Sequence, residues 1–276
     1  MLRLLLVSLL VLGVTLLAAQ QPTATSPKSE TATLPVGTHP NDLAKVAAAI
    51  RDSYYHPDEM SGLDCTVSLD WPAFFSALKL NPAADRLKAI QDVKIRSQAT
   101  RGKKTGVTFK WASGSLDNKE QFEDGINQML GGFYQMYWNI VASSPLSNAA
   151  EISKIEPLSD GGAKVYSSGQ NTNLVIITDK ENTPTHYTFD SPAMSGTIDL
   201  HYVASPKPVP SDLRRISGID TSEQIGTSTM NVKLSLDYQA VDEFYVPRHV
   251  SFDLVGAYSV LMDFSVCSVS KGAIAH

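Results

Sequence analysis

The chain is poor in cysteine and in charge, and both shortages restrict its class. Only Cys65 and Cys267 occur among 276 residues, and charged residues make up 18% of the chain. The formal net charge is -5, so a general attraction to nucleic acid is not expected, and no run interleaves aromatic with basic residues. A hydrophobic content of 43% is typical of a globular fold, and the length suits one large or two modest domains.

Motifs for catalysis are also missing. The sequence contains no Gly-x-Ser-x-Gly, no supported Ser-x-x-Lys and no Cys–His arrangement that would indicate a nucleophile. It has no phosphate-binding loop and no dinucleotide fingerprint, and its carboxylates are dispersed through turns and wet strand faces. We therefore predict a protein that is not an enzyme, with no cofactor.

Histidine offers one polar constellation. If Ser191 faces Gly196 across a turn, His186 and His201 oppose each other with Asp199 nearby. Two imidazoles and a carboxylate are zinc ligands, but no third strong ligand has HExxH-type spacing, so a solvated pair is favoured over a metal site. The same register makes one face apolar through two pairs, Phe189 with Ile198 and Tyr187 with Leu200.

The N-terminus predicts export. Met1-Leu2-Arg3 is followed by an apolar run from Leu4 to Leu17 and by Ala18-Ala19, which are the parts of a secretory signal peptide. The alternative is an uncleaved anchor, although the run is short for a membrane-spanning helix. We expect a periplasmic or secreted protein with a signal peptide at 1–19, a disordered linker at 20–39, one domain at 40–270 and a tail at 271–276.

The two cysteines allow one disulfide in an exported protein, and it would tie the first strand to the last. The alternation of residues opposes this pairing, because Cys65 shares a face with apolar Leu63 and Val67, whereas Cys267 shares a face with polar Ser265. A bridge therefore needs a bulge or a different register, and the alternative is two buried, unreactive thiols.

Apolar and polar residues alternate in three successive runs between Val232 and Val269. Such period-two runs, separated by Asp242-Glu243 and by Val255-Gly256-Ala257, predict neighbouring antiparallel strands with one face buried. The inward residues form three sets: Val232, Leu234, Leu236 and Tyr238; Val250, Phe252 and Leu254; and Val260, Met262, Phe264 and Val266.

The rest of the chain predicts helices first and strands later. The longest helical pattern, Asn118 to Ser144, contains Gly131-Gly132, which indicates a kink or close packing, or a hinge. Lys94 to Lys104 is basic and is interpreted as the wet side of a hairpin in preference to an anion patch. Ser211 to Thr229 is polar and is predicted to be a crossing loop with a short helix. The other predicted elements are helices within 40–56 and 72–91, strands at 61–71 and 107–111, and strands at 152–157, 163–167, 173–178, 185–190 and 197–203.

Three segments resemble the outer-membrane lipoprotein carrier (LolA-like) superfamily. They are Tyr238 to Val250, Ile155-Glu156-Pro157 with Gly161-Gly162, and Ile177 to Pro184. The resemblance implies an α+β fold in which a large curved antiparallel sheet, an unclosed half-barrel, wraps around helices. It also implies that the apolar concave side receives acyl chains.

The sequence therefore predicts a non-catalytic exported protein that binds an apolar ligand, a lipid or a lipoprotein acyl chain, in the concave face of the sheet. The alternatives are a periplasmic interaction or sensing module for an envelope protein and, ranked lower, a hydrolase or metalloenzyme. The sequence makes no prediction of oligomeric state. The candidate ligand contacts are Phe122, Met129, Phe133, Tyr137, Tyr187, Phe189, Phe252 and Phe264.

Overall fold

The structure, a computed structural model, describes residues 40–112, 118–144, 146, 152–168, 172–204 and 213–272. The predicted signal peptide and linker, and residues 273–276 of the predicted tail, lie outside these ranges. No helix within the described ranges has the length and apolar character needed to cross a membrane.

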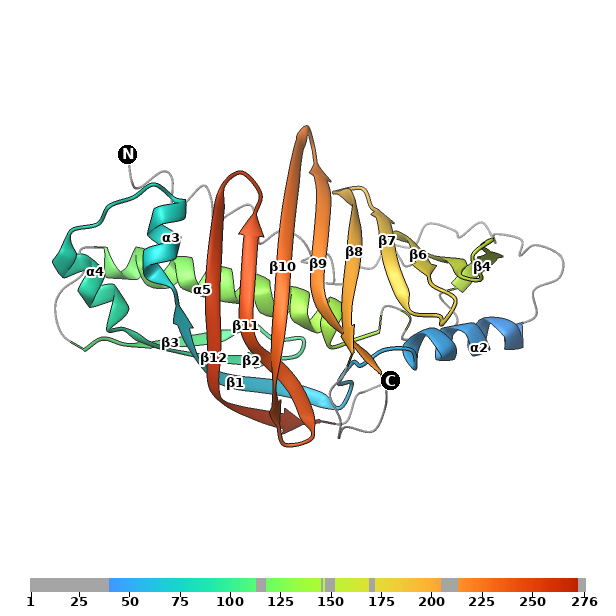
Figure 1. Cartoon of the computed structure of the whole chain (residues 1–276), viewed down its shortest axis with the longest axis horizontal. Coiled ribbons are helices and arrows are strands. Elements are labelled where there is room, and N and C mark those ends of the chain that lie inside the picture. The colour runs from blue at the N-terminus through green and yellow to red at the C-terminus, as the bar shows by residue number, and fades with distance from the viewer. Residues whose placement is uncertain are drawn as a thin grey trace, which may run out of the picture.

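A single antiparallel sheet organises the described chain, and its spatial order is β3-β2-β1-β12-β11-β10-β9-β8-β7-β6-β5-β4 (Figure 1). β3 and β4 are its two edges, so the sheet is not closed into a barrel, and the predicted α+β half-barrel is confirmed. The strands are β1 (Met60–Leu69), β2 (Lys94–Thr100), β3 (Gly106–Lys110), β4 (Ile152–Pro157), β5 (Ala163–Ser168), β6 (Asn173–Thr178), β7 (Pro184–Asp190), β8 (Ser195–Ala204), β9 (Arg214–Ile225), β10 (Ser228–Val241), β11 (Phe244–Leu254) and β12 (Tyr258–Lys271).

The alternating C-terminal runs form β10, β11 and β12 as predicted. On β10, Val232, Leu234 and Leu236 are buried, while the residues between them are exposed. The long helix α5 (Lys119–Met136) lies on the buried side, where the rings of Phe133 and Phe264 are 5.3 Å apart between centroids. We call this side of the sheet the inner face and the opposite, wet side the outer face.

A bulge in β12 resolves the conflict over the cysteines. Asp64 pairs with Ser268 and Thr66 with Ser265, so Cys65 alone faces the two residues Val266 and Cys267. Val266 takes up the extra residue with a φ of 48° and an 84% exposed side chain, and it corrects the prediction that Val266 points inward. Cys267 is thereby returned to the side of Cys65, and the two form a disulfide.

Helices cover the inner face and the ends of the sheet. α5 is continuous through Gly131-Gly132 and passes into a π-helical turn, η1 (Tyr137–Val141), so the chain does not break at the glycines. A Cβ atom on Gly131 would meet no atom within 4 Å, which does not support close packing there. The remaining helices are α2 (Pro40–Arg51), α3 (Trp71–Ala77) and α4 (Ala84–Gln91), and α3 is capped by Asp70, whose carboxylate accepts from the Ala73 amide.

Two sequence predictions about the middle strands are wrong. Phe189 pairs with Gly196 and His186 with Asp199, so the register of β7 and β8 is shifted by two residues from the predicted one. The shift keeps every side chain on its predicted face because the period of a strand is two. The predicted crossing loop at 211–229 is instead the whole of β9 and the start of β10, joined by a turn at Gly226, with residues 211–212 outside the described ranges.

Candidate functional site

At one end of the sheet, α5 fills the inner face with a packed core. Phe133 stacks on Tyr137 at 6.1 Å, and both Phe133 and Tyr134 contact Phe264. The Tyr134 hydroxyl lies 2.7 Å from the Ser97 hydroxyl, which satisfies both buried groups. The helix therefore occupies the concave side beside β1, β2 and β12.

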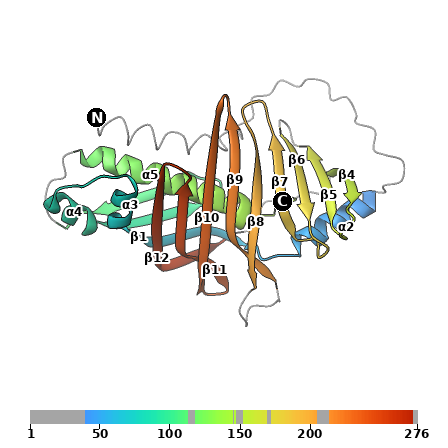
Figure 2. The same ribbon diagram turned by 45° about the horizontal axis from the view of Figure 1, so that its top comes forward.

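The inner face also extends beyond α5, along the upper ends of β7 to β11. The β9–β10 hairpin rises clear of the helix in Figure 1, and Figure 2 shows the same strands standing in front of it. Several inner-face residues in this region are apolar and only half-buried, in contrast to the sealed core beneath them. We call this set the inner rim; its members are Phe189, Ile198, Ile225, Met230, Phe252 and Leu254.

One glycine shapes the inner rim. A Cβ atom at Gly196 would lie 2.8 Å from Cζ of Phe189 and 2.5 Å from the Ser222 carbonyl oxygen. The ring of Phe189 therefore lies across the strand opposite it and occupies the space that a side chain on β8 would need. A larger residue at Gly196 would displace that ring from the inner rim.

The structure divides the eight predicted contact residues into two groups. Phe133, Tyr137, Tyr187 and Phe264 are buried in the core, and the other four are half-buried. Phe122 packs against Trp71 and Trp111, at 5.3 and 5.5 Å, far along α5 from Tyr137. Phe189 and Phe252 belong to the inner rim. The role of all eight in ligand binding remains a prediction.

A buried carboxyl on the inner face escaped the sequence analysis. Glu223 on β9 is 3% exposed, lies between Gly196 and Met230 in the register, and its Oε2 has no hydrogen-bond partner. Burial raises the pKa of Glu223 to about 7. Thr221, two residues earlier on the same face, has a buried hydroxyl, and its interaction with the Glu223 carboxyl opposes part of the rise in pKa. Glu223 and Thr221 are therefore two polar residues on β9 whose neighbours on the inner face are mostly apolar.

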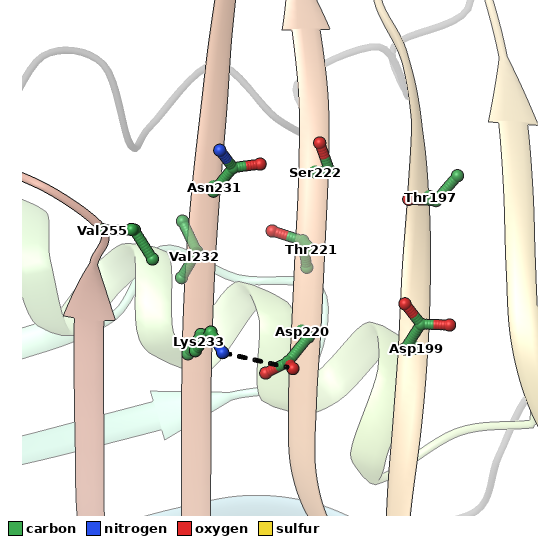
Figure 3. Close-up of a pocket in the computed structure, with 9 residues that line it drawn as sticks. All are labelled: Thr197, Asp199, Asp220, Thr221, Ser222, Asn231, Val232, Lys233 and Val255. Carbon is green, nitrogen blue, oxygen red and sulfur yellow. Dashed lines mark ion pairs between the residues drawn. The ribbon is translucent and has the colours of Figure 1, made fainter.

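A shallow depression of about 280 Å³ lies on the outer face, where β8, β9 and β10 run side by side (Figure 3). Most of the residues around it are polar, although the surface that they expose to it is largely apolar, and Lys233 lies 3.8 Å from Asp220 across it. The nearby histidines are paired with separate carboxylates, His186 with Asp199 at 2.6 Å and His201 with Asp220 at 3.4 Å. The predicted His186–His201 pair is therefore absent, and the depression is not the apolar hollow that the half-barrel led us to expect.

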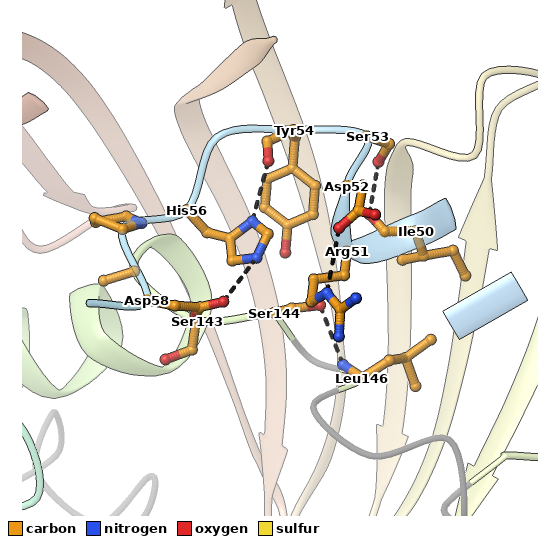
Figure 4. Close-up of polar contacts among 12 residues, drawn as sticks. Ile50, Arg51, Asp52, Ser53, Tyr54, His56, Asp58, Ser143, Ser144 and Leu146 are labelled. Carbon is orange, nitrogen blue, oxygen red and sulfur yellow. Dashed lines mark hydrogen bonds and ion pairs between the residues drawn. The ribbon is translucent and has the colours of Figure 1, made fainter. Parts of the chain in front are cut away.

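The segment between α2 and β1 contains another histidine, His56. Nδ1 of His56 lies 3.0 Å from the Tyr54 carbonyl oxygen and Nε2 lies 3.1 Å from Asp58, so both ring nitrogens have partners (Figure 4). Tyr54 is fully buried between this ring and Tyr202. Throughout the described residues, no group of three or more His, Cys, Asp or Glu side chains is placed to hold a metal ion.

The basic segment Lys94 to Lys104 lies in the β2–β3 hairpin, as the sequence predicted, and two of its arginines make contacts within the protein. Arg101 donates to the Ala142 carbonyl at 2.7 Å and to the Pro57 carbonyl at 3.2 Å, and it lies 5.3 Å from the ring of Trp138. Arg96 forms a two-pronged contact with Asp64 on the neighbouring strand. These arginines fasten the hairpin to the end of η1 and to β1.

No protein-family profile and no curated protein sequence matches the chain. One similar solved structure is a crystal structure of a domain provisionally named an outer membrane lipoprotein-sorting protein domain, from Vibrio parahaemolyticus. It is 10% identical over 84% of this chain and 92% of that chain, with a TM-score of 0.21. That description names the same kind of protein as the sequence resemblance, but at this TM-score no argument rests on it.

Proposed function

We propose that the protein is an exported, non-catalytic binding protein that holds an apolar ligand, such as a lipid or a lipoprotein acyl chain, against the inner rim. The observation that supports it is the half-burial of Phe189, Met230 and Leu254, with the rest of the rim, on the same face that is elsewhere sealed by α5. Removing such side chains from water is favourable, by about 25 cal/mol per Å² of apolar surface. A gathered apolar surface of this kind marks a binding site more often than scattered exposed residues do.

An alkyl chain fits the chemistry of the rim better than a polar ligand does. Each CH2 group that is buried against the rim contributes about 0.8 kcal/mol, so a chain of ten or so carbons reaches a useful affinity without any hydrogen bond. The outer-face depression is bordered by the charged side chains of Asp199, Asp220 and Lys233, whereas no member of the inner rim is charged. The inner face is therefore the side on which we place the ligand.

Organic extraction of the purified protein followed by mass spectrometry tests this function directly, and titration with the apolar fluorophore N-phenyl-1-naphthylamine measures binding. We expect Met230→Asp on the rim to weaken binding of the dye at least about tenfold, because a charge replaces an apolar contact. Asn231→Asp is the matched control, since Asn231 is the next residue on β10 and is exposed on the outer face.

The outcomes separate the proposal from its main alternative. If no lipid is extracted and neither the protein nor its variants bind the dye, apolar binding is wrong and an interaction or sensing module becomes the better hypothesis. Equal weakening by both variants would show that the effect comes from added charge and not from the rim. Circular dichroism of each variant checks that the sheet is intact.

A further inference from the structure

Arg215 on β9 is a buried cation with no anionic partner in the described chain. It is 7% exposed, its Nε is closed off from solvent, and no hydrogen-bond acceptor reaches that nitrogen. Its neighbour Arg214 points the other way and pairs with two carboxylates, Asp179 at 2.8 Å and Glu181. Two adjacent arginines thus have opposite environments.

Aromatic rings hold the Arg215 guanidinium in place. Its central carbon lies 4.2 Å from the centre of the Tyr245 ring and 5.0 Å from that of Tyr238. The Tyr238 hydroxyl donates to the Ile216 carbonyl, and the Tyr245 ring packs edge-on against the Tyr55 ring with centroids 5.6 Å apart, so both rings are held in place. Rings that stack on a guanidinium cover its face and leave its planar edge of N–H donors for an acceptor.

A buried guanidinium differs from a buried carboxyl in how it responds to the loss of water. A buried carboxyl such as Glu223 becomes neutral by taking a proton, but a guanidinium stays protonated at every pH at which proteins fold. Cation–π contacts offset only part of the cost of removing such a charge from water. An anion should therefore bind more favourably to an unpaired buried arginine than to an arginine at the surface.

A second unpartnered donor lies in the same neighbourhood. The Tyr137 hydroxyl is buried and has no hydrogen-bond partner. Burial raises the pKa of Tyr137, and the neighbouring phenols of Tyr238 and Tyr55, which flank Arg215, add to the rise. Tyr137 opens the π-helical turn η1, an irregularity that recurs at functional sites in helices.

We propose that Arg215 is the centre of an oxyanion site, in which a carboxylate or phosphate group binds the edge of the guanidinium between Tyr238 and Tyr245. Two oxygens of such a group match the fork of N–H donors, and this geometry gives the strongest hydrogen bonds that arginine makes. The site goes beyond the apolar binding proposed above and does not depend on it. The anion is either a small free ion or the head group of the apolar ligand.

Thermal unfolding and calorimetry at constant ionic strength test the site, with sodium phosphate, acetate, decanoate and 1-decanol as probes. We expect at least one of the three anions to raise the Tm of the full chain relative to chloride. At about one hundred times its Kd the rise is roughly 5–10 °C for a domain of this size. Arg215→Met should abolish the rise, whereas Arg214→Met should keep it.

The probes also identify the source of the anion. Binding of phosphate or acetate as tightly as decanoate indicates a small free ion, and tighter binding of decanoate indicates the head of an amphiphile. Decanol lacks the charge, so its binding should be the same in wild type and Arg215→Met. Failure of the anion site would leave the dye binding described above unchanged, and the two proposals therefore fail separately.

An absent response to all three anions, or an equal response in Arg215→Met, would overturn the inference. If Arg215→Met does not fold, Arg215→Lys keeps the charge but loses the fork, and it should bind the anion about tenfold or more weakly.

Discussion

Cys65 and Cys267 are bridged across β1 and β12 with their Cα atoms 4.2 Å apart, although 202 residues separate them in the sequence. Cross-linking so long a loop removes much of the freedom of the unfolded chain. We expect reduction, or the double variant Cys65→Ala/Cys267→Ala, to lower the free energy of unfolding by about 2–5 kcal/mol. Urea unfolding with and without dithiothreitol measures the loss. Two thiols titrating in the untreated native protein would contradict the bridge.

Val266 makes that bridge possible at a local cost. Its φ of 48° is left-handed, a region in which β-branched residues are crowded, and its side chain is exposed. Val266→Gly should raise the free energy of unfolding by about 1 kcal/mol, since relief of crowding exceeds the added freedom of the unfolded glycine. A matched Leu261→Gly change, at an exposed position of β12 without the bulge, should destabilise the protein. A loss of stability in Val266→Gly would argue against the bulge.

Gly131 in α5 has room for a methyl group. Gly131→Ala should therefore raise the free energy of unfolding by up to about 1 kcal/mol, as alanine restricts the unfolded chain and favours the helix. Urea unfolding gives the gain, and dye binding to the same variant tests the hinge interpretation. Unchanged binding with higher stability would exclude a hinge at Gly131, whereas weaker binding with higher stability would support one.

Glu223 predicts a dependence of stability on pH. Its pKa in the folded protein is about 7, above the ordinary 4.5, so the folded state holds the proton more tightly than the unfolded state does. The contribution is complete below about pH 4.5 and is lost as pH rises through 7, in total about 3 kcal/mol. In Glu223→Gln this part of the dependence should vanish. Urea unfolding at pH 5, 6, 7 and 8 compares the two proteins, with Glu243→Gln, at an exposed residue, as the control. Parallel curves would show that Glu223 is solvated.

The strands that were predicted correctly are those with uninterrupted alternation. In β10 and β12 each inward position up to Phe264 is apolar, so periodicity alone identified them. β9 was missed because its inward positions include Thr221 and Glu223, which made a buried strand look like a polar loop. The same two residues that hid the strand are buried polar groups on the inner face.

Register was harder to predict than the existence of strands. Pairing Ser191 with Gly196 satisfied both faces of the β7–β8 hairpin, but so does the observed pairing of Asp190 with Ser195, because both put apolar residues opposite apolar ones. Nor does the sequence report that Arg214 has carboxylate partners and Arg215 has none, since that difference depends on the β6–β7 turn and on β10 and β11. Such sites arise from contacts between distant strands and need the structure to be seen.

The place of β1 next to β12 determines the order in which the sheet is completed. Until β12 is available, β3-β2-β1 and β11 to β4 are two separate sheets, and the inward side chains of β1 lack one of their two strand neighbours. In a chain that is synthesised from its N-terminus, the first strand therefore lacks one of its two neighbours until the last strand has been made. Such a non-local pairing is slow to form and leaves an unpaired edge, so this protein should depend more than most on protection from aggregation until β12 has been synthesised.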